Sequence, residues 1–343
     1  MRLRDFVGNQ QMVQILRRGQ LPQASLFTGP EGVGKKTLAL SLAALANCKG
    51  GTEEELCGTC PSCVKEAAGH HPDIWLFQPH KNLIRIGKDA RDPNTMRQLN
   101  REVQFRPFEG RLRFFIIDQA ETMTEEAANC ILKTLEEPPE TSRIILITSF
   151  PHRLLPTIRS RCQTFPFHPL GREEILRYLE DHLTEDHLEM RASLAEGSIA
   201  IALSLDLEET LEQRDRMLGL LTSWCEQESF EALYKQCEQL PLRSELKTRE
   251  GVWRYLNLLH RIGEDLYFLQ VETPERIVNR DRLEDLQKLS EGVELNWVRD
   301  FLYHVDRARW DIDHYVNPLM CFETLWLMSS RETNNVGNRH RQV

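Results

Sequence analysis

Long apolar runs are absent from this sequence. No stretch of the 343 residues approaches the roughly 20 consecutive apolar residues that a membrane-spanning helix needs. The segment from Met1 to Gln10 is charged and does not have the pattern of a secretion signal. These absences exclude the membrane-protein class and predict a cytoplasmic protein with no membrane partner.

An excess of positive charge is absent as well. The chain has 43 Lys and Arg against 52 Asp and Glu, which gives a formal net charge of −9. General nucleic-acid binders have the opposite balance, so any contact with DNA must come from a local patch or a shared surface. One candidate patch is a group of five arginines, at positions 97, 101, 106, 111 and 113. A solvated helix face explains this group better than a phosphate-binding surface does.

The nine cysteines occur without a secretion signal, so we expect reduced thiols or a metal site in place of disulfides. Four of them have the spacing C-x8-C-x2-C-x2-C, which suits one tetrahedral Zn²⁺: Cys48, Cys57, Cys60 and Cys63. An iron–sulfur cluster fits less well, because its fourth cysteine usually follows downstream before a proline. Four unliganded thiols are the remaining alternative. His70 and His71 are expected to be ordinary loop residues.

The segment from Leu26 to Leu38 reads LFTGPEGVGKKTL and predicts a strand, a phosphate-binding P-loop and a helix. Its glycines allow backbone N–H groups to surround phosphate oxygens, and a lysine follows them to reach the terminal phosphates. The candidate nucleotide-binding residues in this segment are Gly29, Gly32, Gly34, Lys35 and Thr37.

Two positions depart from the pattern of a hydrolysing P-loop enzyme. Lys36 stands where a hydroxyl would hold Mg²⁺, and the hydroxyl of Thr37 is one helical position too late. The buried strand RFFII ends in Asp118, which could support Mg²⁺. The next residue is Gln119, whose amide cannot accept a proton from water. We therefore do not expect Mg²⁺ and leave open whether ATP binds.

Several motifs together resemble the clamp-loader subunits of the AAA+ superfamily. They are FVGN, LFTGPEGVGK, the four cysteines, HPD at 71–73, FFIIDQAE, AANCILKTLEEPPE at 127–140, IILITS and LLPTIRSRCQTFPF. Together they cover about the first half of the chain. The resemblance implies a subunit of a bacterial DNA polymerase III clamp loader, of the kind that keeps an arginine finger but not the hydrolytic residues.

The resemblance also implies roles for single residues. Arg161 matches the arginine finger, which reaches into a neighbouring subunit's ATP site and acts there as a catalytic residue. Thr148 or Ser149 falls where a polar residue would contact the γ-phosphate. Ala200 stands where the lid normally offers an arginine to the nucleotide. The implied partners are other clamp-loader subunits, the sliding clamp and primer–template DNA.

The expected architecture has three domains. They are an α/β P-loop domain over 1–168 with a zinc module inserted near 48–63, a helical lid over 169–207 and an all-α collar over 208–330. Residues 331–343 are polar and expected to be disordered. The expected function is that of a clamp-loader subunit without ATPase activity of its own. The alternatives are an active ATPase motor of the same superfamily and, less favoured, a zinc-dependent DNA-binding module.

Overall fold

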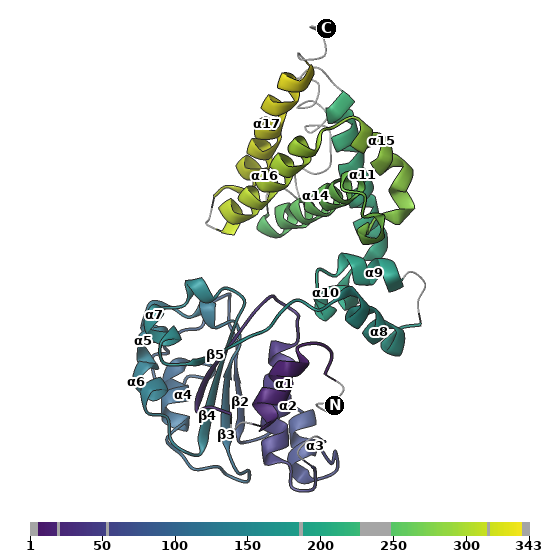
Figure 1. The fold of residues 1–343 in the computed structure, drawn as a ribbon. Helices are drawn as coiled ribbons and strands as arrows, with labels where there is room; N and C mark the ends of the chain where they lie inside the picture. The colour runs from purple at the N-terminus through teal and green to yellow at the C-terminus, as the bar shows by residue number, and fades with distance from the viewer. Residues whose placement is uncertain are drawn as a thin grey trace. The chain divides into compact units, whose positions relative to one another are not determined.

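The computed structural model describes residues 6–18, 21–52, 55–184, 188–226, 248–313 and 316–337 (Figure 1). The chain forms two compact units, Met1–Ser204 and Leu205–Val343. Among the described residues, no helix has both the length and the apolar character needed to cross a membrane.

The first unit is built on a five-stranded parallel sheet with the order β2-β3-β4-β1-β5. The strands are β1 (Ala24–Thr28), β2 (Ile74–Phe77), β3 (Arg113–Ile117), β4 (Ser142–Thr148) and β5 (Gln163–Pro166). β1 and β3 are buried throughout, as expected for strands covered on both faces. Because all strands run in one direction, the residues that follow β1, β3 and β4 come together at one edge of the sheet.

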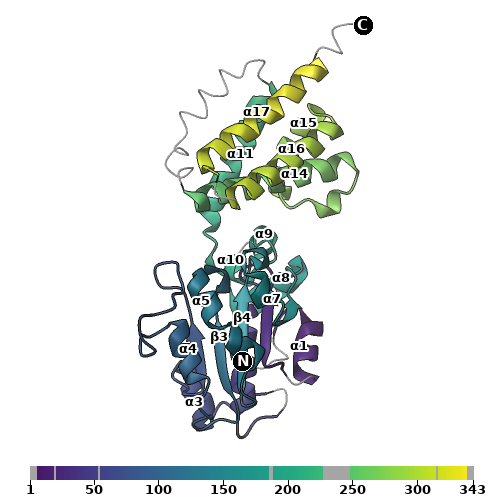
Figure 2. The ribbon, with the colours of Figure 1, turned by 90° about the vertical axis from the view of Figure 1, so that its left-hand side faces the viewer.

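Helices cover both faces of this sheet (Figures 1 and 2). Phe115 and Ile117 face a core formed with α4 (Met96–Glu102), α5 (Glu125–Cys130), α6 (Leu132–Glu136) and α7 (Pro156–Arg159). Phe114 and Ile116 face the opposite core, formed with α1 (Gln10–Arg18) and α2 (Lys35–Asn47). The alternation of neighbouring residues between two cores follows from the two-residue period of a strand.

Three helices follow the sheet within the same compact unit: α8 (Arg172–His182), α9 (Leu188–Leu194) and α10 (Ile199–Ser204). They have a small core of their own, which includes Ile175, Leu179 and Ala202. These helices correspond to most of the region 169–207 that the sequence predicts to be a lid. Its status as a separate domain stays a prediction.

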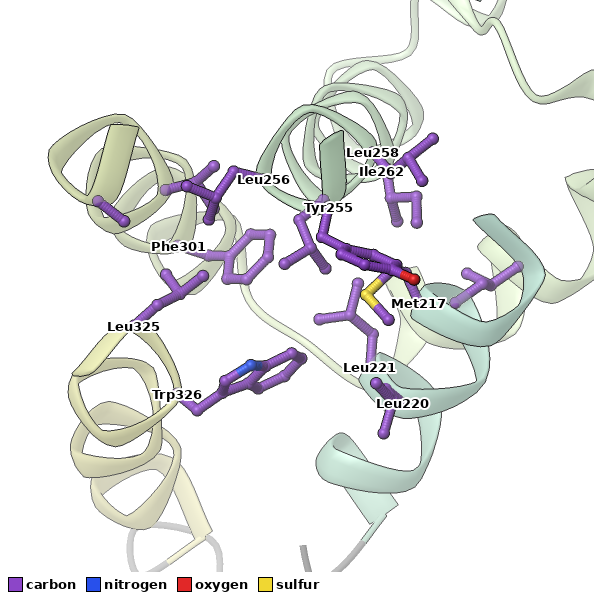
Figure 3. Close-up of a cluster of buried hydrophobic side chains, with 14 of the residues drawn as sticks. Met217, Leu220, Leu221, Tyr255, Leu256, Leu258, Ile262, Phe301, Leu325 and Trp326 are labelled. Carbon is purple, nitrogen blue, oxygen red and sulfur yellow. The ribbon is translucent and has the colours of Figure 1, made fainter. Parts of the chain in front are cut away.

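The second unit is entirely helical in its described part. It contains α11 (Leu207–Glu226), α14 (Arg249–Gln270), α15 (Leu283–Glu291), α16 (Leu295–Asp313) and α17 (Pro318–Gly337). Its core joins α11, α14, α16 and α17 through large side chains such as Tyr255, Phe301 and Trp326 (Figure 3). Short 3-10 turns complete the fold at Ala120–Thr122, Pro151–Arg153, Pro274–Arg276 and Arg280–Arg282.

The predicted fold class is therefore confirmed: a parallel α/β P-loop fold, helices after it and an all-α C-terminal region. One difference concerns the polar end of the chain. α17 continues to Gly337, into the stretch 331–343 that polarity alone predicted to be disordered. A polar sequence can extend a helix that packing has already nucleated, and Phe322 and Trp326 of α17 are buried. Residues 338–343 lie outside the described residues.

Candidate functional site

A cavity of about 600 Å³ opens at the carboxyl edge of the sheet, between the P-loop and α10. Its volume lies in the range of small-molecule sites. One part of its wall is polar and contains Gly32, Lys35, Asp118 and Thr148, and another is apolar. The apolar wall includes Phe6, Val7, Ile199 and Leu203. The first compact unit thus brings six of the seven predicted nucleotide-binding residues to one pocket, and Gly29 is the one that does not line it.

The P-loop lysine is directed back onto its own loop. Lys35 Nζ donates hydrogen bonds to the carbonyls of Gly29 and Pro30, at 2.5 and 2.6 Å, and to Ser149 Oγ at 3.1 Å. Burial lowers the pKa of Lys35 to about 8, although the carboxylates of Glu121, Glu31 and Asp118 oppose this shift. A phosphate that entered the loop would compete with these carbonyls for the ammonium group.

The residue after this lysine forms an ion pair with the acid that follows β3. Lys36 Nζ lies 3.1 Å from Asp118 Oδ2, which forms an ion pair between the P-loop helix and the end of β3. Asp118 also accepts a longer hydrogen bond from Gln78 Nε2 at 3.4 Å. A carboxylate that would support a divalent cation is therefore neutralised by a side chain of the same chain.

Two polar residues that the sequence analysis passed over or left open lie in this pocket. Ser149 is the member of the Thr148–Ser149 pair that contacts Lys35, whereas the buried Thr148 hydroxyl accepts from the Phe150 N–H at 3.0 Å. Glu121 lines the pocket and has a buried carboxylate oxygen, Oε2, without a hydrogen-bond partner. Its position three residues after Asp118 could have indicated that it shares the same side of a helical turn.

The lid contacts the P-loop closely at Gly32. A Cβ atom placed on Gly32 would lie 2.0 Å from Ser198 Oγ and 2.8 Å from Ala200 Cβ. Gly32 also has a φ of 74°, a value that side-chain-bearing residues seldom adopt. Ala200 therefore packs against the loop, and its methyl group cannot bind phosphate.

Arg161 lies apart from this pocket, just after α7. Its guanidinium donates to Glu136 Oε1 through Nε at 2.6 Å and through Nη2, and to the Thr157 carbonyl through Nη1 at 2.9 Å. Its side chain is 30% exposed and that of Glu136 is 47% exposed. The guanidinium is thus held in place at the surface, where a second molecule could reach it.

The four cysteines predicted to bind metal converge. The Sγ atoms of Cys48, Cys57 and Cys63 are separated by 3.5 to 3.9 Å, and the four Sγ atoms all lie within 4.8 Å of one another. Sulfurs bound at 2.3 Å to one tetrahedral Zn²⁺ would be about 3.8 Å apart. Backbone N–H groups of Thr59 and Cys60 lower the pKa of the Cys57 thiol to about 5, whereas burial raises the pKa of the Cys63 thiol to about 12, so the fit to a metal rests on the positions of the sulfurs. The donor set fits a structural metal ion.

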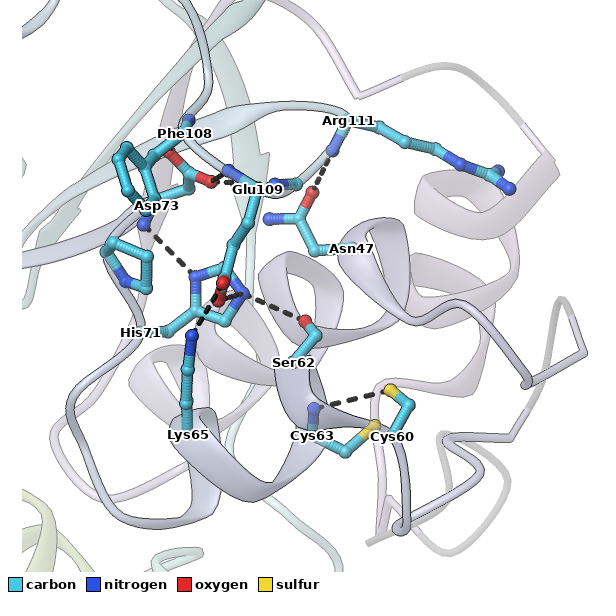
Figure 4. A network of polar contacts seen from close by, with 12 residues as sticks. Asn47, Cys60, Ser62, Cys63, Lys65, His71, Asp73, Phe108, Glu109 and Arg111 are labelled. Carbon is cyan, nitrogen blue, oxygen red and sulfur yellow. Dashed lines mark hydrogen bonds and ion pairs between the residues drawn. The ribbon is translucent and has the colours of Figure 1, made fainter.

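This cysteine cluster adjoins a buried polar network (Figure 4). His71 is buried, and its Nδ1 accepts from the Asp73 N–H at 3.1 Å while its Nε2 lies 2.8 Å from Ser62 Oγ. His71 lies in a loop and outside the group of four cysteines, as expected, but Nδ1 and Nε2 both have partners inside the protein, so it also supports the fold. His70, in contrast, is exposed.

The arginines between 97 and 113 do not form one phosphate-binding surface. Arg113 is buried and bonds to Glu102, and Arg101 pairs with Glu102 as well. Arg97 donates to the Lys88 carbonyl. Arg106 and Arg111 remain exposed. The structure therefore favours the structural explanation that the sequence analysis preferred.

Comparisons with known proteins identify a matching family model and several relatives of this chain. Residues 8–171 match the family model described as "DNA polymerase III, delta subunit". The chain is 30% identical over 275 residues to DNA polymerase III subunit delta' of Bacillus subtilis, with 80% of each protein covered. It is 34% identical over 209 residues to the Pseudomonas aeruginosa delta' subunit, of which it covers 62%.

Two further matches are a longer subunit and a solved structure. The chain is 33% identical over 286 residues to the Escherichia coli tau subunit and covers 43% of that protein. A gamma subunit-related protein from Thermotoga maritima aligns over 93% of this chain and 99% of its own, with 19% identity and a TM-score of 0.42. That score is too low to refine the fold described above. The relationship to the Bacillus subtilis protein is decisive: the chain belongs to the family of DNA polymerase III delta' subunits.

Proposed function

We propose that this protein is a clamp-loader subunit that does not hydrolyse ATP and instead supplies Arg161 to ATP bound by a neighbouring subunit. A guanidinium provided by a second subunit stabilises charge on the transferred phosphoryl group, with an effect of about 10³–10⁵ on the rate in related enzymes. The family to which the chain belongs and the surface position of Arg161 support this function.

The observation that carries the proposal is the Lys36–Asp118 ion pair. Hydrolysis in P-loop enzymes requires Mg²⁺ held by a hydroxyl after the P-loop lysine and supported by an acid. Here the hydroxyl is replaced, and the acid is bonded to the replacing ammonium. Gln119 and Ala200 lack the basic and cationic groups that would otherwise assist. We infer that any ATP that enters the pocket binds without a firmly coordinated Mg²⁺.

The geometry around Arg161 suits transfer between subunits. Glu136 is 47% exposed, so water already screens its attraction for the guanidinium, and the pair contributes little to stability. A triphosphate has a higher negative charge than one carboxylate and could displace it. Glu136 would then act as a positioning residue that keeps Arg161 extended before the subunits meet.

The proposed partners follow from the family and its relatives. Tau, gamma and delta' proteins are all named as subunits of DNA polymerase III, so we propose a hetero-oligomer with such subunits, packed through the helical C-terminal unit. Contacts with the sliding clamp and with primer–template DNA belong to the same proposal. So do a cytoplasmic location and one structural Zn²⁺ held by the four cysteines.

ATP hydrolysis by the purified chain tests the proposal. We expect no turnover above that of a Lys35→Ala variant of the isolated chain, which lacks the P-loop lysine of the pocket, and restored complex activity when the wild-type chain is mixed with its ATPase partners. Turnover by the isolated wild-type chain would contradict the proposal.

An active ATPase motor remains the second candidate. The retained glycines, Lys35 and the unpartnered Glu121 oxygen favour it, since Glu121 is a carboxylate in the pocket. If this candidate is right, Glu121→Gln should abolish the turnover measured with the isolated chain.

A further inference from the structure

We infer that the four-cysteine metal centre holds loop residues 108–112 in one conformation and thereby fixes the backbone that carries the exposed Phe108. The inference depends on the proposed Zn²⁺ site. Phe108 is 83% exposed, which is unusual for a large apolar side chain. Such a side chain stays in one place only if the backbone beneath it is fixed.

The loop backbone is bound by the side chains of two buried residues, Asp73 and Asn47. Asp73 accepts from the N–H groups of Phe108, Glu109 and Gly110 at 2.7, 2.9 and 2.8 Å. Asn47 Oδ1 accepts from the N–H groups of Arg111 and Leu112 at 2.8 and 3.1 Å (Figure 4). Five consecutive amides of the loop therefore depend on these two residues.

The first connection between the loop and the metal passes through two residues that are adjacent in the sequence. Asn47 is the last residue of α2 and precedes the ligand Cys48. Asn47 is buried, and a Cβ atom on Gly110 would lie only 2.5 Å from its Oδ1, so the loop packs tightly on its amide. Any motion of Cys48 would move the group that holds Arg111 and Leu112.

The second connection passes through α3 (Pro61–Ala67), whose first turn contains the ligand Cys63 and whose N-cap is the ligand Cys60. From this helix, Ser62 Oγ contacts His71 Nε2 at 2.8 Å, and Lys65 Nζ contacts Glu109 Oε2 at 2.5 Å. His71 Nδ1 in turn accepts from the Asp73 N–H. Since Nδ1 accepts, Nε2 has the proton and donates to Ser62.

The metal would add a direct link between the two connections, beyond the packing of α2 against α3. The segment between Cys48 and Cys60 is polar and has few apolar side chains, so it contributes little packing of its own. One ion bound to all four sulfurs would fix α3 against the end of α2. The loop bridges these two elements through Asn47, Asp73 and Glu109, so removal of the ion should loosen the loop.

Hydrogen exchange on the full chain tests this inference without any substitution. Zinc content is measured first, and Zn²⁺ is then removed with a competing chelator. We expect faster exchange at amides 108–112 and unchanged exchange in β3 and β4. If zinc is present but amides 108–112 exchange at the same rate after removal, the inference is overturned. It is also overturned if the whole sheet loosens equally, whereas a protein without zinc refutes the proposed metal site itself.

Zinc affinity provides an independent measurement, because coupling between two sites is reciprocal. Asn47→Ala leaves all four cysteines in place and should weaken Zn²⁺ binding by roughly five- to tenfold. Asn100→Ala is the matched control, since Asn100 also bonds backbone and side-chain groups, at Cys130 and Thr134, but away from the metal site. Equal zinc affinities in the two variants would contradict the inference.

Discussion

Lys36 Nζ and Asp118 Oδ2 lie 3.1 Å apart, so a cation of the protein stands beside the acid that a magnesium ion would need. The two residues come from different elements, the first turn of α2 and the end of β3. The carboxylate of Asp118 is 15% exposed, whereas the side chain of Lys36 is 38% exposed and partly screened by water. This ion pair joins one departure from a hydrolytic P-loop, Lys36, to the acid that such a loop would use, Asp118.

Replacement of Lys36 by threonine should therefore change how the pocket binds nucleotide. Lys36→Thr restores the hydroxyl and frees Asp118, so we expect ATP binding to become dependent on Mg²⁺, with at least tenfold tighter binding in its presence. Titration calorimetry with and without Mg²⁺ measures this effect. Lys36→Met, which removes the charge but gives no hydroxyl, is the control. The same magnesium response in both variants would argue against the assignment.

Loss of the Arg161 guanidinium should slow the assembled complex. Arg161→Ala is expected to reduce turnover at the neighbouring ATP site by a factor on the order of 10³ while the subunits still assemble. Steady-state ATPase assays and size-exclusion chromatography test both parts. Arg159→Ala, a change at another exposed arginine two positions earlier, should have little effect. Equal activity of the Arg161→Ala and wild-type complexes would refute the finger role.

The zinc content of the protein should depend on the four cysteines. Elemental analysis is expected to find one zinc per wild-type chain and a loss of that zinc in Cys60→Ser, because a serine hydroxyl is a poor ligand at this kind of site. Cys130→Ser is the matched control, since Cys130 lies outside the cluster. A wild-type chain without zinc would remove the basis for this assignment.

The pH dependence of stability should report the burial of Lys35. Its pKa falls from 10.5 to about 8 on folding, so between these values the unfolded chain holds a proton that the folded chain has lost. The free energy of unfolding should therefore increase as the pH rises through that window. Lys35→Met lacks this contribution. Urea unfolding of both proteins between pH 7 and 10 measures it, and parallel stability profiles would contradict the prediction.

Replacement of a buried phenylalanine should lower the stability far more than replacement of an exposed one. Phe115→Ala removes a fully buried ring from the middle of β3 and should lower the free energy of unfolding of its unit by about 3–5 kcal/mol. Phe108→Ala removes a ring that is 83% exposed and should change stability by no more than about 0.5 kcal/mol. Denaturant unfolding compares the two. A large loss in Phe108→Ala would show that this ring packs against something in the folded chain.

Much of the architecture follows from local sequence patterns. The buried strand before Asp118, the glycine-rich turn before Lys35 and the helical stripes that contain Val252 and Phe301 each depend on spacing along the chain. Their predicted elements are present in the structure. The cysteine spacing likewise placed the four thiols in one group, because short intervals limit how far apart the sulfurs can lie.

The groups that this protein has and lacks can be listed from its residues alone: a P-loop without a hydroxyl after its lysine, an arginine after α7 and four clustered thiols. The contacts of these groups depend on the folded chain. Folding brings Lys36 to Asp118, Ser149 to Lys35, and Asn47 and Asp73 to the backbone of residues 108–112. Such contacts join residues far apart in the chain, and their distances depend on how the strands and helices pack. Spacing along the sequence therefore does not predict these contacts.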